Sequence, residues 1–197
     1  MITLPTSKVP ATSTNPKFLI LYGRPKCGKT SALAQLDNNL IIDLEGGSTF
    51  IDAMAVQARS VNDLGEIAQA IRAKNTEVGH NLYRHITIDN ATRLEEICLG
   101  YAATLYKKTP LGKKWEGTDV KTLPNGSGYL YIRQAVRKVI DMFRELCDEF
   151  ILVGHVKDVQ IEQNGEELNQ MALDLVGKLG TIICGESDAV GLVYRKG

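Results

Sequence analysis

Short apolar runs alternate with amphipathic stretches along most of the chain. The runs with the length and composition of buried strands span 18–22, 40–45, 85–89, 150–156 and 188–194. Between them, apolar residues recur at helical spacing in 31–36, 60–74, 91–106, 129–147 and 179–184. Strands that alternate with helices predict an α/β fold, with a mostly parallel central sheet and helices on both of its faces.

Two segments stand outside this alternation. Residues 1–16 hold prolines among serine, threonine and asparagine, which is typical of a flexible arm or a docking segment. Asn164-Gly165 separates short runs at 159–163 and 166–171, and this dipeptide is a strong signal for a β-hairpin turn. We therefore expect a flexible N-terminal arm at 1–16 and one α/β domain at 17–197.

Composition narrows the class of protein. The 197 residues suit one domain with a proper core, and 23 basic residues balance 23 acidic ones. A contact with nucleic acid must then come from a local patch of charge. The four cysteines lack the C-x-x-C spacing of zinc and redox sites, which indicates reduced thiols and an intracellular protein. No apolar run approaches the ~18 residues of a membrane span, so we expect no membrane partner.

The clearest chemistry lies in a loop between the first predicted strand and helix. GRPKCGKT, from Gly23 to Thr30, fits the phosphate-binding pattern G-x-x-x-x-G-K-[ST] without a mismatch. Its glycines let backbone N–H groups turn toward a phosphate, Lys29 reaches the β- and γ-phosphates, and the Thr30 hydroxyl ligates Mg²⁺. The residues predicted to bind the nucleoside triphosphate are Gly23, Arg24, Pro25, Lys26, Cys27, Gly28, Lys29, Thr30 and Ser31.

Polar residues at the ends of three other predicted strands are candidates for catalysis. Asp89 closes HITID, where a carboxylate holds the Mg²⁺ shell in P-loop proteins. Glu45 and Asp43 compete to polarise the attacking water, because strand alternation decides which side chain faces the ligand crevice. His155 follows FILVG and is placed to contact the γ-phosphate or the water. Each also has a plain alternative, as a helix cap, a solvated charge or a structural histidine.

A lysine-rich segment between the third and fourth predicted helices is the candidate for nucleic-acid contact. It reads KKTPLGKKWEGTDVK and holds the only tryptophan of the chain. Cations that follow phosphates beside an aromatic that stacks on bases are the usual recipe for binding single strands. A solvated loop is the competing interpretation. The residues predicted to contact DNA are Lys107, Lys108, Lys113, Lys114 and Trp115.

Taken in order, these motifs resemble those of the RecA-like ATPases. In that family the catalytic glutamate closes an I-D-x-E stretch, which Ile42-Asp43-Leu44-Glu45 matches, so the resemblance favours Glu45 over Asp43. The family's Mg²⁺ aspartate falls on Asp89, and its γ-phosphate sensor, usually glutamine, falls on His155. More narrowly, GRPKCGKTSALAQL, IIDLEGG, TIDNATRLEEIC and VGHVK resemble phage-encoded nucleotide-binding proteins, including ATPases that assist single-strand annealing in recombination.

The resemblance implies several properties beyond the motifs themselves. It implies ATP hydrolysis stimulated by single-stranded DNA, assembly into a ring or filament, and a single-strand DNA-binding protein as a further partner. Two mobile DNA-binding loops fall near 107–128 and 157–180. A basic finger from the neighbouring protomer falls on Arg195 and Lys196, with an exposed chain end as the alternative. The expected location is the cytoplasm, that of the host for a phage-encoded protein.

Other classes of P-loop protein remain as alternatives to this function. One is a small-molecule kinase or a GTPase, although the sequence has no Asn-Lys-x-Asp guanine reader and its 107–128 stretch is rich in lysine, not in the arginine of kinase lids. Another is a nucleotide-dependent regulator that scarcely hydrolyses, against which Glu45 and Asp89 both argue. ATP turnover with and without single-stranded DNA separates these functions.

Overall fold

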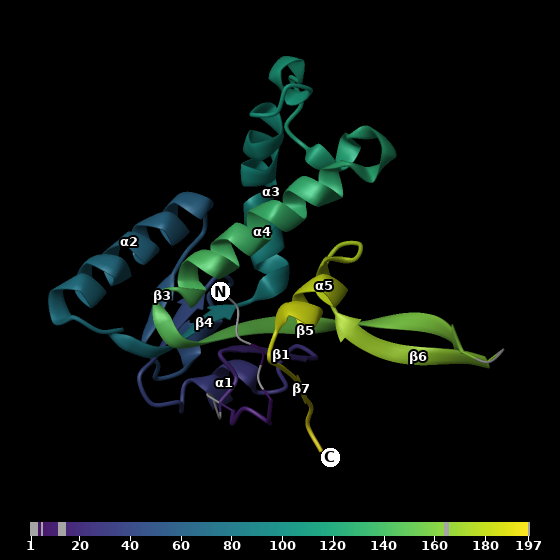
Figure 1. Cartoon of the computed structure of the whole chain (residues 1–197). Helices are drawn as coiled ribbons and strands as arrows, with labels where there is room; N and C mark the ends of the chain where they lie inside the picture. The colour runs from purple at the N-terminus through teal and green to yellow at the C-terminus, as the bar shows by residue number, and fades with distance from the viewer. Residues whose placement is uncertain (1–3, 5, 12–14, 164–165, 197) are drawn as a thin grey trace.

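One seven-stranded sheet organises the computed structural model, which describes residues 4, 6–11, 15–163 and 166–196 (Figure 1). The strands lie in the order β3-β2-β4-β5-β1-β7, each parallel to its neighbours, and β6 pairs antiparallel with β5. The mostly parallel α/β sheet predicted from the sequence is confirmed. The strands are β1 (Phe18–Gly23), β2 (Asn39–Asp43), β3 (Ala55–Gln57), β4 (Tyr83–Asp89), β5 (Cys147–Gln163), β6 (Glu166–Leu173) and β7 (Ala189–Val193).

Helices cover both faces of the sheet, as expected, but very unequally (Figure 1). Alternate residues of β1 show why: Phe18 and Ile20 face the large core under α2 to α5, whereas Leu19 and Leu21 face the small cluster that holds Leu33 of α1. Each helical stretch predicted from the spacing of apolar residues is present. The helices are α1 (Lys29–Leu33), α2 (Val61–Val78), α3 (Ala91–Lys107), α4 (Gly128–Arg144) and α5 (Leu179–Glu186).

Side-chain caps begin α2 and α3 on the large face. Ser60 and Asp63 form a capping box at the start of α2. Asn90 caps α3, since its side-chain oxygen accepts the N–H of Arg93. The cap of α3 directly follows Asp89, so the last residue of β4 and the first turn of α3 are held together at the carboxyl edge of the sheet.

In the segment after the fourth core strand, the runs predicted at 159–163 and 166–171 pair as the hairpin signal indicates, whereas the mobile loop implied by the resemblance is not found. Residues 150–156 and 159–163 belong to the single long strand β5, whose second half leaves the core sheet and pairs with β6 in a projecting hairpin (Figure 1). The mobile loop expected at 157–180 is therefore largely an ordered two-stranded ribbon. Backbone hydrogen bonds along eight paired positions explain the order. The Asn164-Gly165 turn lies outside the described residues.

Two remaining segments lack long elements. The described part of 1–16 forms no helix or strand, while residues 1–3, 5 and 12–14 lie outside the description. Residues 107–128 form short 3₁₀ turns against α3 and α4, namely η2 (Gly112–Lys114), η3 (Val120–Thr122) and η4 (Pro124–Gly126). Within the described ranges, no helix is long and apolar enough to cross a membrane.

Candidate active site

Close packing of two strands forces the shape of the phosphate-binding loop. Gly23 ends β1 beside β7, and a Cβ atom there would lie 2.2 Å from the backbone oxygen of Val193. Gly28 caps α1 with a φ of 97°, in the left-handed region that glycine adopts without strain. Both glycines of the motif are thus required by the backbone, and the loop between them curls over the N-terminus of α1.

Lys29 lies inside this curl, with only 6% of its surface exposed. Its Nζ atom donates hydrogen bonds to the carbonyl oxygens of Gly23 and Arg24, each at 3.0 Å. The Sγ atom of Cys27 lies 3.7 Å from the same ammonium. A buried ammonium held by two backbone carbonyls and a thiol sulfur can exchange them for phosphate oxygens, which are stronger acceptors because they are charged.

The two residues predicted to hold Mg²⁺ are in direct contact. The Thr30 hydroxyl donates to Oδ2 of Asp89 at 2.6 Å. Burial raises the pKa of the Asp89 carboxyl, as do the nearby charges of Asp43 and Glu45, while the Thr30 hydrogen bond and the Lys29 charge act in the opposite direction. A hydroxyl and a carboxylate are the hard oxygen donors that Mg²⁺ takes alongside phosphate oxygens and water.

No cluster of three or more His, Cys, Asp or Glu side chains that could hold a metal ion occurs in the described part of the chain. A dedicated protein cage for a metal is therefore absent from those residues. Thr30 and Asp89 alone fit the sparse protein ligand set of a Mg²⁺ ion carried by a nucleotide, in which the phosphates supply further ligands.

Asp43 and Glu45, which competed as the catalytic base, have different surroundings. Asp43 is 3% exposed and accepts hydrogen bonds from the backbone N–H groups of Glu45, Gly46 and Ser48 and from the Ser48 hydroxyl. Burial acts to raise the pKa of Asp43, but these hydrogen bonds outweigh it and hold the pKa below its usual value. Asp43 thus fastens the turn after β2, while the side chain of Glu45 is 48% exposed.

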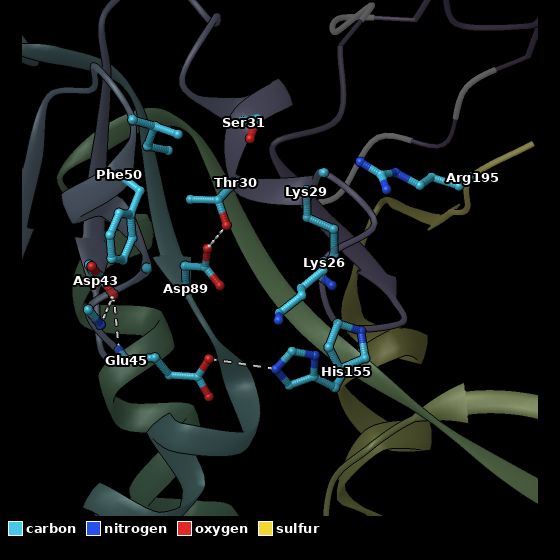
Figure 2. A pocket seen from close by; sticks show the side chains of 15 residues that line it. Lys26, Lys29, Thr30, Ser31, Asp43, Glu45, Phe50, Asp89, His155 and Arg195 are labelled. Carbon is cyan, nitrogen blue, oxygen red and sulfur yellow. Dashed lines mark hydrogen bonds and ion pairs between the residues drawn. The ribbon is translucent and has the colours of Figure 1, made fainter.

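His155, in β5, faces Glu45 across the site (Figure 2). Its Nε2 atom lies 3.7 Å from Oε2 of Glu45 and 2.9 Å from Nδ2 of Asn90. The other ring nitrogen, Nδ1, is buried and has no hydrogen-bond partner in the described part of the structure. His155 therefore lies within reach of both the candidate base and the residue that follows Asp89.

These elements enclose a cavity of about 640 Å³, within the range of ligand pockets. It brings together the loop residues Pro25, Lys26, Gly28, Lys29, Thr30 and Ser31 with Asp43, Glu45, Asp89 and His155. Figure 2 shows Arg195 entering from the segment after β7, on the side opposite Phe50. Arg195 thus lines the cavity of its own chain. Of the other predicted residues, Gly23, Arg24 and Cys27 shape the loop without lining this cavity.

Sequence reasoning missed two residues of this region. Phe50 lines the cavity with 91% of its surface exposed, and the only signal for it is its position shortly after Glu45. Asn90 is completely buried against His155. Its signal was its place between an acidic strand end and a predicted helix, where asparagine is a preferred cap.

The lysine-rich segment lies at the far end of α3 and α4 from the phosphate-binding loop (Figure 1). Its lysines are exposed, and none forms an ion pair with another described residue. Trp115 is half-buried: its ring meets Tyr106 edge-on at 5.2 Å, and Nζ of Lys107 lies 5.5 Å from the ring centre. The DNA-binding role of this segment stays a prediction, as do the roles of Arg195 and Lys196.

Comparison with known proteins gives one family. A family model described as an AAA domain matches residues 15–197, which is nearly the whole chain. A search of curated proteins found no match. The matched range contains the phosphate-binding loop, the Thr30–Asp89 contact and the cavity. The chain therefore belongs to the AAA domain family of P-loop ATPases.

Proposed function

We propose that this protein hydrolyses ATP with Mg²⁺ and acts with single-stranded DNA in phage-type recombination or strand annealing. The observation that carries the hydrolytic part is that Lys29, the Thr30–Asp89 pair and the half-exposed Glu45 side chain line one cavity. The part that concerns DNA and phage recombination rests on the resemblance of the motifs and on the exposed lysines of 107–121.

Each side chain has a defined task in this reaction. Lys29 and the loop N–H groups bind the β- and γ-phosphates, and Thr30 with Asp89 holds the Mg²⁺ ion. When bound, Mg²⁺ offsets the charge that builds up on the transferred group. Glu45 accepts a proton from water as the water oxygen bonds to the γ-phosphorus, and the bridging oxygen leaves with ADP.

A carboxylate-to-amide change tests the hydrolytic role. Glu45→Gln keeps the shape of the side chain and removes the base, so we expect turnover to fall by ~10²-fold or more with ATP still bound. Binding is measured with a fluorescent ATP analogue and turnover by phosphate release. Glu66→Gln, on the exposed side of α2, is the matched control and should leave both quantities unchanged.

Turnover that survives in Glu45→Gln would remove Glu45 as the base. A protein that binds ATP without measurable turnover in any form would instead be a nucleotide-dependent regulator. Transfer of the γ-phosphoryl group to a small molecule would favour the kinase alternative.

The role in DNA binding predicts a salt effect. Each phosphate that a lysine neutralises releases a counterion, so affinity for a single strand should fall steeply with salt. Lys113→Ala/Lys114→Ala should lower the slope of log affinity against log salt by about 1 to 2 and weaken the stimulation of ATP turnover by DNA. Arg72→Ala/Lys74→Ala, on α2, is the control pair. Turnover indifferent to DNA, from a strict monomer, would leave a P-loop ATPase with another role.

A further inference from the structure

The first step concerns how the amide of Asn90 is oriented. Oδ1 of Asn90 accepts the N–H of Arg93 at 3.0 Å, the hydrogen bond that caps α3. With Oδ1 committed to the cap, the group that faces Nε2 of His155 at 2.9 Å is Nδ2. An amide NH₂ group only donates hydrogen bonds. The helix cap therefore fixes which end of the amide meets the histidine.

The orientation of the amide decides where the proton of His155 lies. Because Nδ2 of Asn90 can only donate, Nε2 of His155 must accept, and the neutral ring carries its proton on Nδ1. A proton on Nε2 would instead place two donors against each other 2.9 Å apart. The buried Nδ1–H finds no partner among the described residues, which is a cost that this arrangement bears.

The location of this proton matters for Glu45. Oε2 of Glu45 lies 3.7 Å from Nε2 of His155, close enough for a hydrogen on that nitrogen to attract the carboxylate. While the Nε2 lone pair accepts from Asn90, His155 has no hydrogen to offer on that side. The carboxylate then keeps its oxygens for water, in agreement with its 48% exposure.

We propose that Asn90 is a positioning residue, which holds His155 in the Nδ1–H form and so keeps the Glu45 carboxylate free to accept a proton from water. The inference rests on the proposed function for the role of Glu45. Its structural half, the hold of Asn90 on His155, stands on the two hydrogen bonds of Asn90 alone. The other charged side chains lining the same cavity are Lys26, Lys29, Asp43, Asp89 and Arg195.

One substitution keeps the helix cap that Asn90 provides and removes its donor to His155. Asn90→Asp keeps an oxygen for the N–H of Arg93, since aspartate caps helices as well as asparagine does. It also places an acceptor against Nε2 of His155, which must then carry a proton. In protein labelled with ¹⁵N-histidine, the ring resonances should show Nδ1–H in the wild type and a protonated Nε2 in Asn90→Asp. His155→Gln assigns the signal among the three histidines.

Two spectroscopic results would overturn the proposal: an Nε2–H ring in the wild type, or an unchanged ring in Asn90→Asp. Thermal unfolding checks that the variant keeps its fold. If Asn90→Asp does not fold, Asn90→Ser takes its place, since serine also caps but is too short to donate to the ring. The ring of His155 should then no longer be held in the Nδ1–H form alone, and an unaltered spectrum would again contradict the proposal.

Turnover of ATP tests the second half. Asn90→Asp should lower turnover by about tenfold or more, because the hydrogen that Nε2 then carries, 3.7 Å from Oε2 of Glu45, is shared between the new carboxylate and the base. When His155 is already replaced by Gln, Asn90→Asp should not lower ATP turnover further, since Asn90 acts through the ring of His155. A full additional loss in that background would show that Asn90 acts by another route and overturn the inference. Absence of turnover in the wild type would overturn the proposed function itself, while the ring spectrum still decides the hold on His155.

Discussion

Asp43 has a carboxylate that receives four hydrogen bonds and supports the turn that carries Glu45. Asp43→Asn puts an amide donor against N–H groups, so we expect a loss of ~1–3 kcal/mol in the free energy of unfolding at neutral pH. The turn would also hold Glu45 less firmly, and turnover should fall, but by less than in Glu45→Gln. Denaturant unfolding and phosphate release measure the two effects.

The pH dependence of this loss has a definite sign. Because the pKa of Asp43 is lowered in the folded state, the ionised carboxylate stabilises the fold at any pH above the ordinary aspartate pKa of about 3.9. That contribution disappears as the pH falls through the lowered pKa. The difference between wild type and Asp43→Asn should therefore shrink in acid. Asp52→Asn, at an exposed position, is the control, and a gap that stays constant with pH would refute the assignment.

Sequence alone left Asp43 and Glu45 tied, and the reason is geometrical. Strand alternation sorts neighbouring residues only while the strand continues, and β2 ends at Asp43. Glu45 lies in the turn beyond, where hydrogen bonds to Asp43 decide its direction. Lys29, Thr30 and Asp89 were predictable because their places follow from the loop motif and the strand end. Asn90 was not, since a cap signal says nothing of a second partner.

Among the elements, α3 contacts the segment before α5 through a buried carboxylate. Glu95 accepts the N–H of Val176 at 2.8 Å, and Thr92 donates to the backbone oxygen of Asp174 at 2.9 Å. The backbone N–H of Asp174 in turn donates to the oxygen of His155 at 2.9 Å. The base of the hairpin is thus fastened both to the active-site strand and to α3.

Glu95 gives a prediction of opposite sign to that of Asp43. Burial raises the pKa of Glu95, although the Val176 hydrogen bond and the charges of Lys121 and Lys157 oppose the shift. The folded protein therefore holds this proton more tightly than the unfolded chain, and wild-type stability falls as pH rises from about 4.3 through the raised pKa. Glu95→Gln keeps an acceptor for the N–H of Val176. As the pH rises through this range, the variant should become more stable relative to the wild type.

Denaturant unfolding of both proteins at several pH values measures this gain. Glu66→Gln, whose side chain is exposed, serves as the control with no such slope. If Glu95→Gln were less stable than the wild type by the same amount at every pH, the carboxylate would be ionised throughout, and burial would not govern it.

Among the secondary-structure elements, the long helices could be predicted from the sequence, and some strands could not. A repeat of apolar residues over many turns identifies α2, α3 and α4 unambiguously. β3 has only three residues, too few to show a period. The long β5 changes partners partway along, from two parallel neighbours to the antiparallel β6, and periodicity carries no information about partners. That is why the sequence predicts the two halves of β5 as separate strands, at 150–156 and 159–163.

At the scale of the whole molecule, the two candidate functions lie in separate places, one at the edge of the sheet and one at the tips of two helices (Figure 1). The nucleotide cavity lies at the carboxyl edge of the strands, whereas the exposed lysines lie at the distal ends of α3 and α4 (Figure 1). If DNA stimulates turnover, we expect the effect to reach the cavity through α3, which Asn90 caps. The topology of the sheet brings the residues of the cavity together from segments far apart in sequence, which no local pattern could show.

Arg195 decides whether one chain or two make a complete site. The resemblance implies a finger that acts on the neighbouring protomer, with an exposed chain end as the alternative, yet Arg195 lines the cavity of its own chain. Arg195→Ala should reduce turnover, and an arginine finger is worth ~10³-fold elsewhere.

Mixing Glu45→Gln protein with Arg195→Ala protein distinguishes a site made by one chain from a site made by two. A finger acting between chains would combine an intact Glu45 with an intact Arg195 in some of the mixed sites. From its place in the cavity, we expect no recovery of turnover on mixing, and Lys196→Ala as the matched control should stay close to the wild type. Recovery in the mixture would establish the arrangement between protomers, and with it an assembled active form.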